Sequence, residues 1–157
     1  MDPQINEMIT YWREHGIEVL PGTQEAELSA FEHRFGLHFP EVFRSYLRLA
    51  NGMVRGAWSE DLVHFWSLDE MAEHLGESGS IQRYPFVPFA DYSINCWVWG
   101  LPIDLSGDVR DEVCSYGPPL ELCAPTFSVF ATRYVRGENL APRMLASRPR
   151  PHWKASD

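Results

Sequence analysis

The chain has 157 residues, of which 45% are hydrophobic and 13% aromatic, so it holds enough apolar material for one folded domain and is not intrinsically disordered. Its formal net charge is −9, and because residues 133–157 contribute six bases and two acids, residues 1–132 carry a net charge of −13. A body this acidic repels nucleic acid and anionic membranes and favours a basic protein partner, although acidic charge can also serve solubility alone.

Three helices are predicted in the N-terminal third. The first begins with the cap and proline pair Asp2-Pro3 and ends at Gly16. The second is expected to be capped by Thr23 and to end at Gly36, and the third begins at Pro40 and ends at Asn51-Gly52. Apolar residues at helical spacing form their buried faces: Ile5, Met8, Ile9 and Trp12, then Leu28, Phe31 and Phe35, then Phe43, Tyr46, Leu47 and Ala50.

The middle of the chain alternates between short strands and turns. A strand is predicted at 62–66, followed by the capping-box pattern Ser67-Leu-Asp-Glu70, which begins a short helix ending at Gly76, and by a loop at 77–80. Further strands are predicted at 86–89, 94–99, 101–105 and 113–116, separated by turn residues at Asp91, Gly100 and Ser106-Gly107. Pro88 and Pro102 indicate sheet edges or bulges.

Residues 126–136 have a composition that suits a strand, but their apolar positions fit the helical period, so a helix is predicted there. The expected fold class is therefore α+β: a single domain with helices packed on a twisted, mainly antiparallel sheet over residues 1–137. A basic tail rich in Pro and Arg is assigned to residues 138–157, and from Ala141 onward it is expected to be extended and mobile. One core should contain the following residues: Leu28, Phe31, Phe35, Phe43, Tyr46, Leu47, Phe89, Val98 and Phe130.

The N-terminal segment lacks the basic start and apolar run of a secretory signal, and no stretch has the roughly 18 apolar residues of a membrane span. A cytoplasmic location is expected. The three cysteines, Cys96, Cys114 and Cys123, are odd in number and form no CxxC pair, which argues against a disulfide framework or a zinc knuckle. We expect them to be reduced, with Cys96 in the core.

Patterns for catalysis and cofactor binding are missing from the sequence. No G-x-S-x-G or phosphate-binding glycine motif occurs, and His33 and His38 flank the helix stop at Gly36, so they do not share one helical face as paired metal ligands. The adjacent acids Glu60-Asp61 and Asp69-Glu70 would allow acid–base chemistry but are more typical of solvated charges. We therefore predict no catalytic residue, no cofactor and no metal site.

Residues 24–52 combine an acidic helix, an F-x-x-x-F-G stop, an apolar-x-x-Pro entry and an aromatic helix ending in Asn-Gly. This arrangement resembles the N-terminal signature of the SUKH superfamily, which includes fungal glucan-synthesis regulators and bacterial immunity proteins. Residues 86–91 and 97–105 resemble its central sheet, and 126–130 its closing helix, with Thr126 in place of the usual serine and Phe39 where leucine is commoner. The matching signature positions are Leu28, Phe31, Phe35, Gly36, Leu37, Pro40, Phe43, Tyr46, Leu47, Asn51 and Gly52.

The resemblance implies a non-enzymatic α+β domain that binds a protein. Bacterial members are typically encoded beside polymorphic or contact-dependent toxins, often nucleases, and block them, so an immunity protein with a basic toxin partner is the favoured interpretation. The alternative is a regulatory or scaffolding module for a housekeeping partner such as a cell-wall synthesis regulator. The binding surface is expected in acidic loops with nearby aromatic anchors, comprising Trp58, Glu60, Asp61, Asp69, Glu70, Asp104, Asp108, Asp111 and Glu112.

Overall fold

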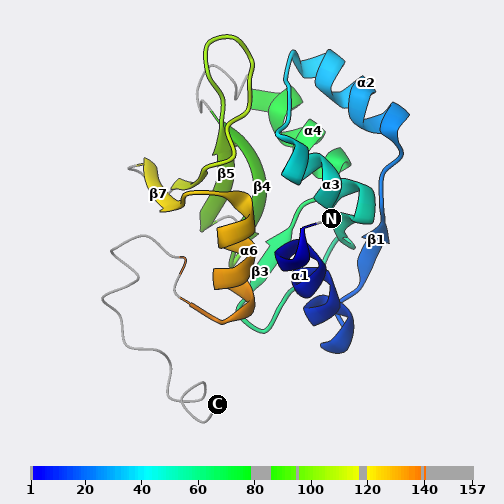
Figure 1. The fold of residues 1–157 in the computed structure, drawn as a ribbon, viewed down its shortest axis with the longest axis vertical. Helices are drawn as coiled ribbons and strands as arrows, with labels where there is room; N and C mark the ends of the chain where they lie inside the picture. Colours follow the sequence, from blue (N-terminus) through cyan, green and yellow to red (C-terminus); the bar gives the residue numbers. More distant parts are fainter. Residues whose placement is uncertain (1, 79–85, 95, 117–119, 139, 141–157) are drawn as a thin grey trace.

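Figure 1 shows the computed structural model of the chain, which describes residues 2–78, 86–94, 96–116, 120–138 and 140. A five-stranded antiparallel sheet has helices packed against it, and a second sheet of two strands lies beside it. The predicted α+β class with a mainly antiparallel sheet is confirmed.

The three N-terminal helices are α1 (Pro3–Glu14), α2 (Glu25–Phe35) and α3 (Glu41–Leu49). Asp2 caps α1 by accepting the Gln4 N–H at 2.9 Å, and α2 ends at Gly36, whose φ of 65° is the left-handed conformation that glycine adopts at helix ends. The predicted cap at Thr23 is wrong: its hydroxyl donates to the Leu47 carbonyl at 3.1 Å. This bond ties the start of α2 to the end of α3.

The small sheet pairs β1 (Val19–Pro21) with β2 (Ala50–Met53), and neither strand was expected from the sequence. Asn51-Gly52, predicted as a helix stop, instead lies inside β2, directly after α3. Gly52 has a φ of 69°, and a Cβ there would lie 2.6 Å from the Trp66 carbonyl carbon and 2.8 Å from the Phe65 carbonyl oxygen. The glycine therefore allows β2 to pass closely over the chain at 65–66.

The large sheet contains β3 (Val63–Phe65), β4 (Phe86–Tyr92), β5 (Trp97–Pro102), β6 (Val113–Tyr116) and β7 (Leu120–Ala124), each antiparallel to the next. The register of β4 shifts between Pro88 and Ala90, so the bulge expected at Pro88 is present. The separate strands expected at 94–99 and 101–105 are replaced by one strand, β5, which contains only residues 97–102. The strand β7 was not expected. Gly100 is no turn but an interior position of β5, where a Cβ would lie 2.6 Å from the Val87 carbonyl oxygen.

The remaining helices are α4 (Leu68–Ser78) and α6 (Phe127–Val135). Thr126 caps α6, its hydroxyl accepting the Val129 N–H at 3.1 Å, which confirms the predicted helix. The predicted stop at Gly76 is wrong, because α4 continues to Ser78 and includes the first half of the loop expected at 77–80. Residues 79 and 80 lie outside the described residues.

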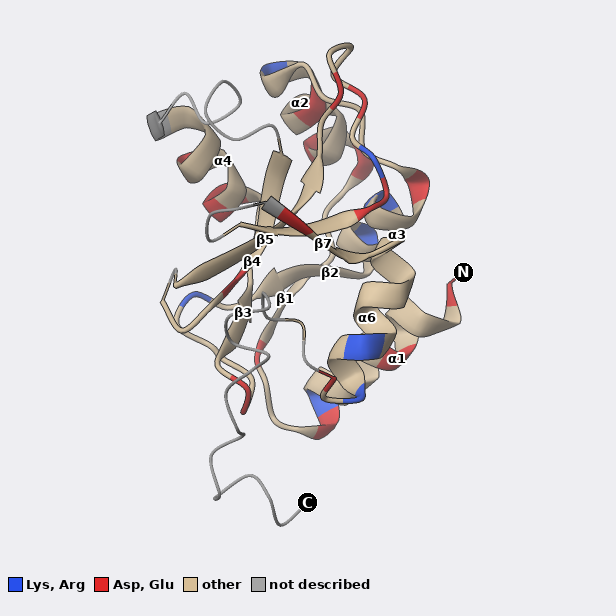
Figure 2. Ribbon diagram, turned by 90° about the vertical axis from the view of Figure 1, so that its left-hand side faces the viewer, with Lys and Arg blue, Asp and Glu red and all other residues tan. Residues whose placement is uncertain are grey.

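Aromatic side chains form the centre of the core between the sheet and the helices. Phe43 on α3 is fully buried, with its ring centroid 5.8 Å from that of Phe89 on β4 and 5.0 Å from that of Phe127 on α6. Phe31 is also buried, whereas Phe35 and Val98, expected in the core, are half-buried at its margin. The views in Figures 1 and 2 place α1, α3 and α6 together on one face of the sheet.

The helices α1 and α6 lie side by side (Figure 1), and the Trp12 indole donates to the Tyr134 hydroxyl at 3.2 Å. Beyond α6 the chain returns to the sheet, since Leu140 is buried and its carbonyl accepts the Trp99 indole N–H at 2.9 Å. Leu140 is therefore part of the packed structure. Residues 139 and 141–157 of the predicted tail lie outside the described residues.

Candidate protein-binding surfaces

Seven of the nine predicted binding residues lie at opposite ends of the large sheet, and the other two, Asp69 and Glu70, lie at the start of α4. Residues 58–61 lead into β3, whose Val63 pairs with Tyr92, and Tyr92 pairs with Trp97 at the start of β5. Residues 104–112 follow the other end of β5, after Pro102.

At the β3 end, the Trp58 ring is half-buried with its centroid 5.8 Å from the His64 ring, Glu60 is exposed and Asp61 is half-buried. Between them Ser59 is buried, and its hydroxyl accepts the Val63 N–H at 3.2 Å. The loop is thus held to β3 at its centre while Glu60 remains in solvent.

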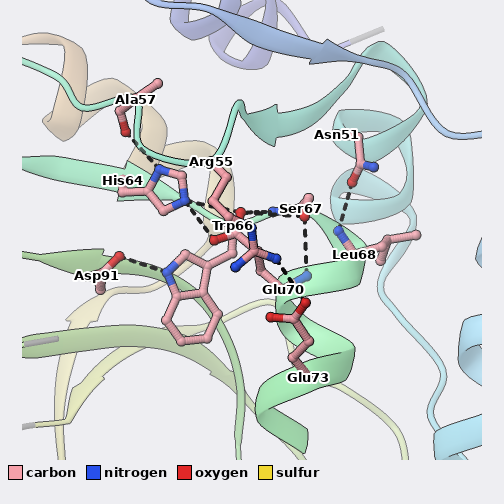
Figure 3. Close-up of polar contacts among 10 residues, drawn as sticks. All are labelled: Asn51, Arg55, Ala57, His64, Trp66, Ser67, Leu68, Glu70, Glu73 and Asp91. Atoms are coloured by element: carbon pink, nitrogen blue, oxygen red, sulfur yellow. Dashed lines mark hydrogen bonds and ion pairs between the residues drawn. The ribbon is translucent and has the colours of Figure 1, made fainter. Parts of the chain in front are cut away.

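Glu70, at the start of α4, takes part in a network of internal hydrogen bonds (Figure 3). Its carboxylate accepts the Ser67 N–H at 3.2 Å while the Ser67 hydroxyl accepts the Glu70 N–H at 3.2 Å, which confirms the capping box. The same carboxylate lies 2.9 Å from Nε2 of the buried His64. Glu70 therefore holds β3 and α4 together.

His64 has acceptors at both ring nitrogens. Nδ1 lies 2.8 Å from the Ala57 carbonyl and Nε2 lies against the Glu70 carboxylate, so the doubly protonated ring satisfies both contacts. Burial by itself lowers the pKa of His64, but the hydrogen bond and charge of Glu70 outweigh it and raise the pKa above its ordinary value. Nearby, the Trp66 indole donates to Asp91 at 2.7 Å and Asn51 accepts the Leu68 N–H at 2.8 Å (Figure 3).

Asp69, next to Glu70 in sequence, is exposed at a different surface. It lines an open groove of about 460 Å³ between α2 and α4, whose walls carry charges of both signs. One wall pair, Arg55 and Glu73, forms an ion pair at 2.8 Å. The residues lining the groove are Arg34, Arg55, Asp69, Ala72, Glu73 and Gly76.

At the β5 end, the carboxylates mainly fix the loop between β5 and β6. Asp104 accepts the Ser106 and Asp108 N–H groups at 2.8 and 3.0 Å, and its hydrogen bond with the Ser106 hydroxyl contributes most to lowering the pKa of its carboxyl. Asp111 accepts the Phe127 N–H at 3.1 Å, and Glu112 pairs with Arg110 at 2.8 Å. Of this group Asp104 and Asp108 are exposed, and Asp111 and Glu112 are half-buried.

The sequence matches the model of the SMI1/KNR4 family (SUKH-1) over residues 22–133. The chain belongs to this family. The match begins at Gly22, before α2, and ends within α6, so it includes the whole five-stranded sheet. Among the curated proteins searched, none matches the sequence.

The helix α1 precedes the residues of the family match, and it packs on α6 through Trp12 and Tyr134. In the described part of the chain, no group of three His, Cys, Asp or Glu side chains is placed to hold a metal ion, and no helix is long and apolar enough to cross a membrane. Cys96 is exposed, so its expected place in the core is wrong, whereas Cys114 is buried and burial raises the pKa of its thiol to about 11.

Sequence reasoning missed an apolar surface beside Glu60 and Asp61. Leu62 is 44% exposed and Ile94, in the turn between β4 and β5, is 76% exposed. Neither residue type signals a turn, so nothing in the sequence pattern pointed to them. The structure brings both to the β3 end of the sheet.

Proposed function

We propose that this chain is a cytoplasmic bacterial immunity protein that binds and neutralises a cognate polymorphic or contact-dependent toxin and catalyses no reaction itself. Membership of the SUKH-1 family over residues 22–133 is the observation that carries the proposal. The internal hydrogen bonds of His64, Glu70 and Asp104 add support, because these polar groups stabilise loops and helix ends. The proposal requires neither cofactor nor metal.

A nuclease is the toxin class that best fits the charge of the chain. An enzyme that binds nucleic acid needs a basic surface for the phosphates, and the net charge of −9 complements such a surface. Exposed acids such as Glu60, Asp69 and Asp108 would steer the encounter, while aromatic and aliphatic anchors would hold the complex.

The proposal predicts that a gene beside this one encodes a toxin domain, and co-expression with that domain tests it. The chain should restore growth of cells that express the toxin, and isothermal titration calorimetry with a catalytically inactivated toxin should show a 1:1 complex. The unrelated toxin of another system serves as the specificity control. Continued toxicity despite a folded, expressed chain, with no heat of binding, would refute the proposed function.

A further inference from the structure

The β3 end of the large sheet concentrates unusual backbone geometry. Within the described residues, the non-glycine residues with positive φ are Leu62 (63°), Ser93 (48°) and Ile94 (55°). The Ser93 N–H donates to the Leu62 carbonyl at 3.0 Å, so all three lie together. This left-handed conformation is unfavourable for residues with a Cβ and most unusual for a β-branched residue such as Ile94.

Two of these three residues, Leu62 and Ile94, expose apolar side chains. Turns of this geometry are ordinarily occupied by Gly, Asn or Asp, which adopt positive φ at little cost and are compatible with water. Here Leu62 and Ile94 are 44% and 76% exposed, at the same end of the sheet as the half-buried residues Tyr92 and Trp97, which pair across β4 and β5. Folding alone gives no reason for this choice of residues, and strain of this kind is concentrated at functional sites.

Acidic residues border this apolar surface. Glu60 and Asp61 directly precede Leu62, and Glu60 is exposed. Their negative field reaches α1, where burial is the main cause that raises the pKa of Tyr11 and the charges of Asp61 and Glu60 raise it further. A partner at this surface therefore meets two apolar side chains next to a negative potential.

We propose that an apolar tip of this chain docks into an apolar pocket bordered by Lys or Arg on the toxin surface. The apolar tip consists of Leu62 and Ile94, the turn residue Ser93 and the two bordering acids Glu60 and Asp61. This inference rests on the proposed immunity function and names the part of the chain that makes the central contact. The strained turns hold Leu62 and Ile94 in solvent before the partner arrives, so little conformational entropy is lost on binding.

Charge argues against other binding partners for the apolar tip. A second copy of this chain docked tip to tip would bring Glu60 and Asp61 of both copies together, and like charges at close range are unfavourable. An anionic membrane is disfavoured by the same two acids. An apolar pocket bordered by Lys or Arg complements both the apolar side chains and the acids of the tip.

The test uses Leu62→Gly and Ile94→Gly, because glycine adopts positive φ without strain while it removes the proposed anchor. The matched control is Leu122→Ala, which removes a leucine that is 63% exposed on β7, at the opposite edge of the sheet. The probe is the catalytically inactivated toxin domain used in the co-expression experiment. Its affinity for each variant is measured by calorimetry, and each melting temperature by circular dichroism.

Each tip variant should bind about 30-fold more weakly, the loss typical of an interface anchor, with a melting temperature no lower than that of the unaltered chain. The Leu122→Ala variant should bind normally. Normal binding by both tip variants would overturn the tip while leaving the immunity function intact, as would a dimer of the unaltered chain in analytical ultracentrifugation that Ile94→Gly dissociates. If the unaltered chain does not bind the toxin, both the proposed function and the proposed docking of the tip are refuted.

Discussion

Gly52 and Gly16 offer a comparison in which the backbone conformation is the same and the surroundings differ. Their φ values are 69° and 67°, but a Cβ at Gly16 would meet nothing within 4 Å, whereas at Gly52 it would lie 2.6 Å from the Trp66 carbonyl carbon. Gly16→Ala should therefore cost the left-handed penalty of about 1–2 kcal/mol, partly offset by about 0.4–1 kcal/mol because alanine restricts the unfolded chain. A net loss near 1 kcal/mol is expected.

Gly52→Ala has the same conformational penalty for a positive φ, and its Cβ also clashes with main-chain atoms. Main-chain atoms cannot relieve the clash by changing rotamer, as a flexible side chain can. Relief requires β2 to move away from residues 65–66, which disturbs its pairing with β1 and the hydrogen bond that the Leu68 N–H donates to Asn51. We expect a total loss of about 4 kcal/mol or more, in the range of severe single substitutions.

Urea unfolding followed by tryptophan fluorescence measures both variants on one scale, and Gly52→Ala should lose at least about 2 kcal/mol more than Gly16→Ala. Circular dichroism at low urea confirms that each variant begins folded. Equal losses for the two variants would show that β2 does not pass closely over residues 65–66, and the reasoning from the clash would be refuted.

Three further predictions concern the core, the buried ion pair and metal dependence. Phe43→Ala should lose about 3–5 kcal/mol in urea unfolding, because the side chain is fully buried, and Phe35→Ala should lose clearly less. The raised pKa of His64 gives stability that is complete below its unfolded pKa of about 6.5 and is lost as pH rises through its folded value. The lowered pKa of Glu70, whose burial is outweighed by the His64 contact, gives stability that is lost under acid. His64→Gln should therefore flatten the fall in unfolding free energy as the pH rises above about 6.5, and an unchanged slope would count against the ion pair. Dialysis against a chelator should leave the melting temperature unchanged, and a fall would indicate a bound metal.

Local signals located the helices, although the cap expected at Thr23 and the stop expected at Gly76 were wrong. The cap at Asp2, the capping box at Ser67 and the cap at Thr126 each satisfy backbone groups within four residues along the chain, so the sequence alone contains both partners. The strands depend on more distant partners. Asn51-Gly52 is an ordinary helix-ending pair in sequence, and its place in β2 follows from pairing with Val19–Pro21 about thirty residues earlier.

Gly100 shows the same limit for the large sheet. Glycine between two apolar runs is typical of a turn, yet here it continues β5 because the chain at 86–87 passes too close for a side chain. Cys96 was assigned to the core by residue type, but it belongs to the exposed turn before β5. Both errors arise because burial is decided by which segments face each other, which the local pattern does not contain.

For the candidate site, the sequence identified the acidic residues but not how far apart they lie in the fold. The number of acids in the sequence does not indicate their distance from one another. In the structure Glu60 and Asp108 lie near opposite ends of β5, a strand of six residues that is about 20 Å long. At an ionic strength of about 0.1 M the screening length is near 10 Å, so acids at one end of the sheet act weakly on a partner docked at the other. A partner at Leu62 and Ile94 therefore responds mainly to Glu60 and Asp61. The carboxylates around Asp104, bonded within their own loop, contribute chiefly to the stability of that loop.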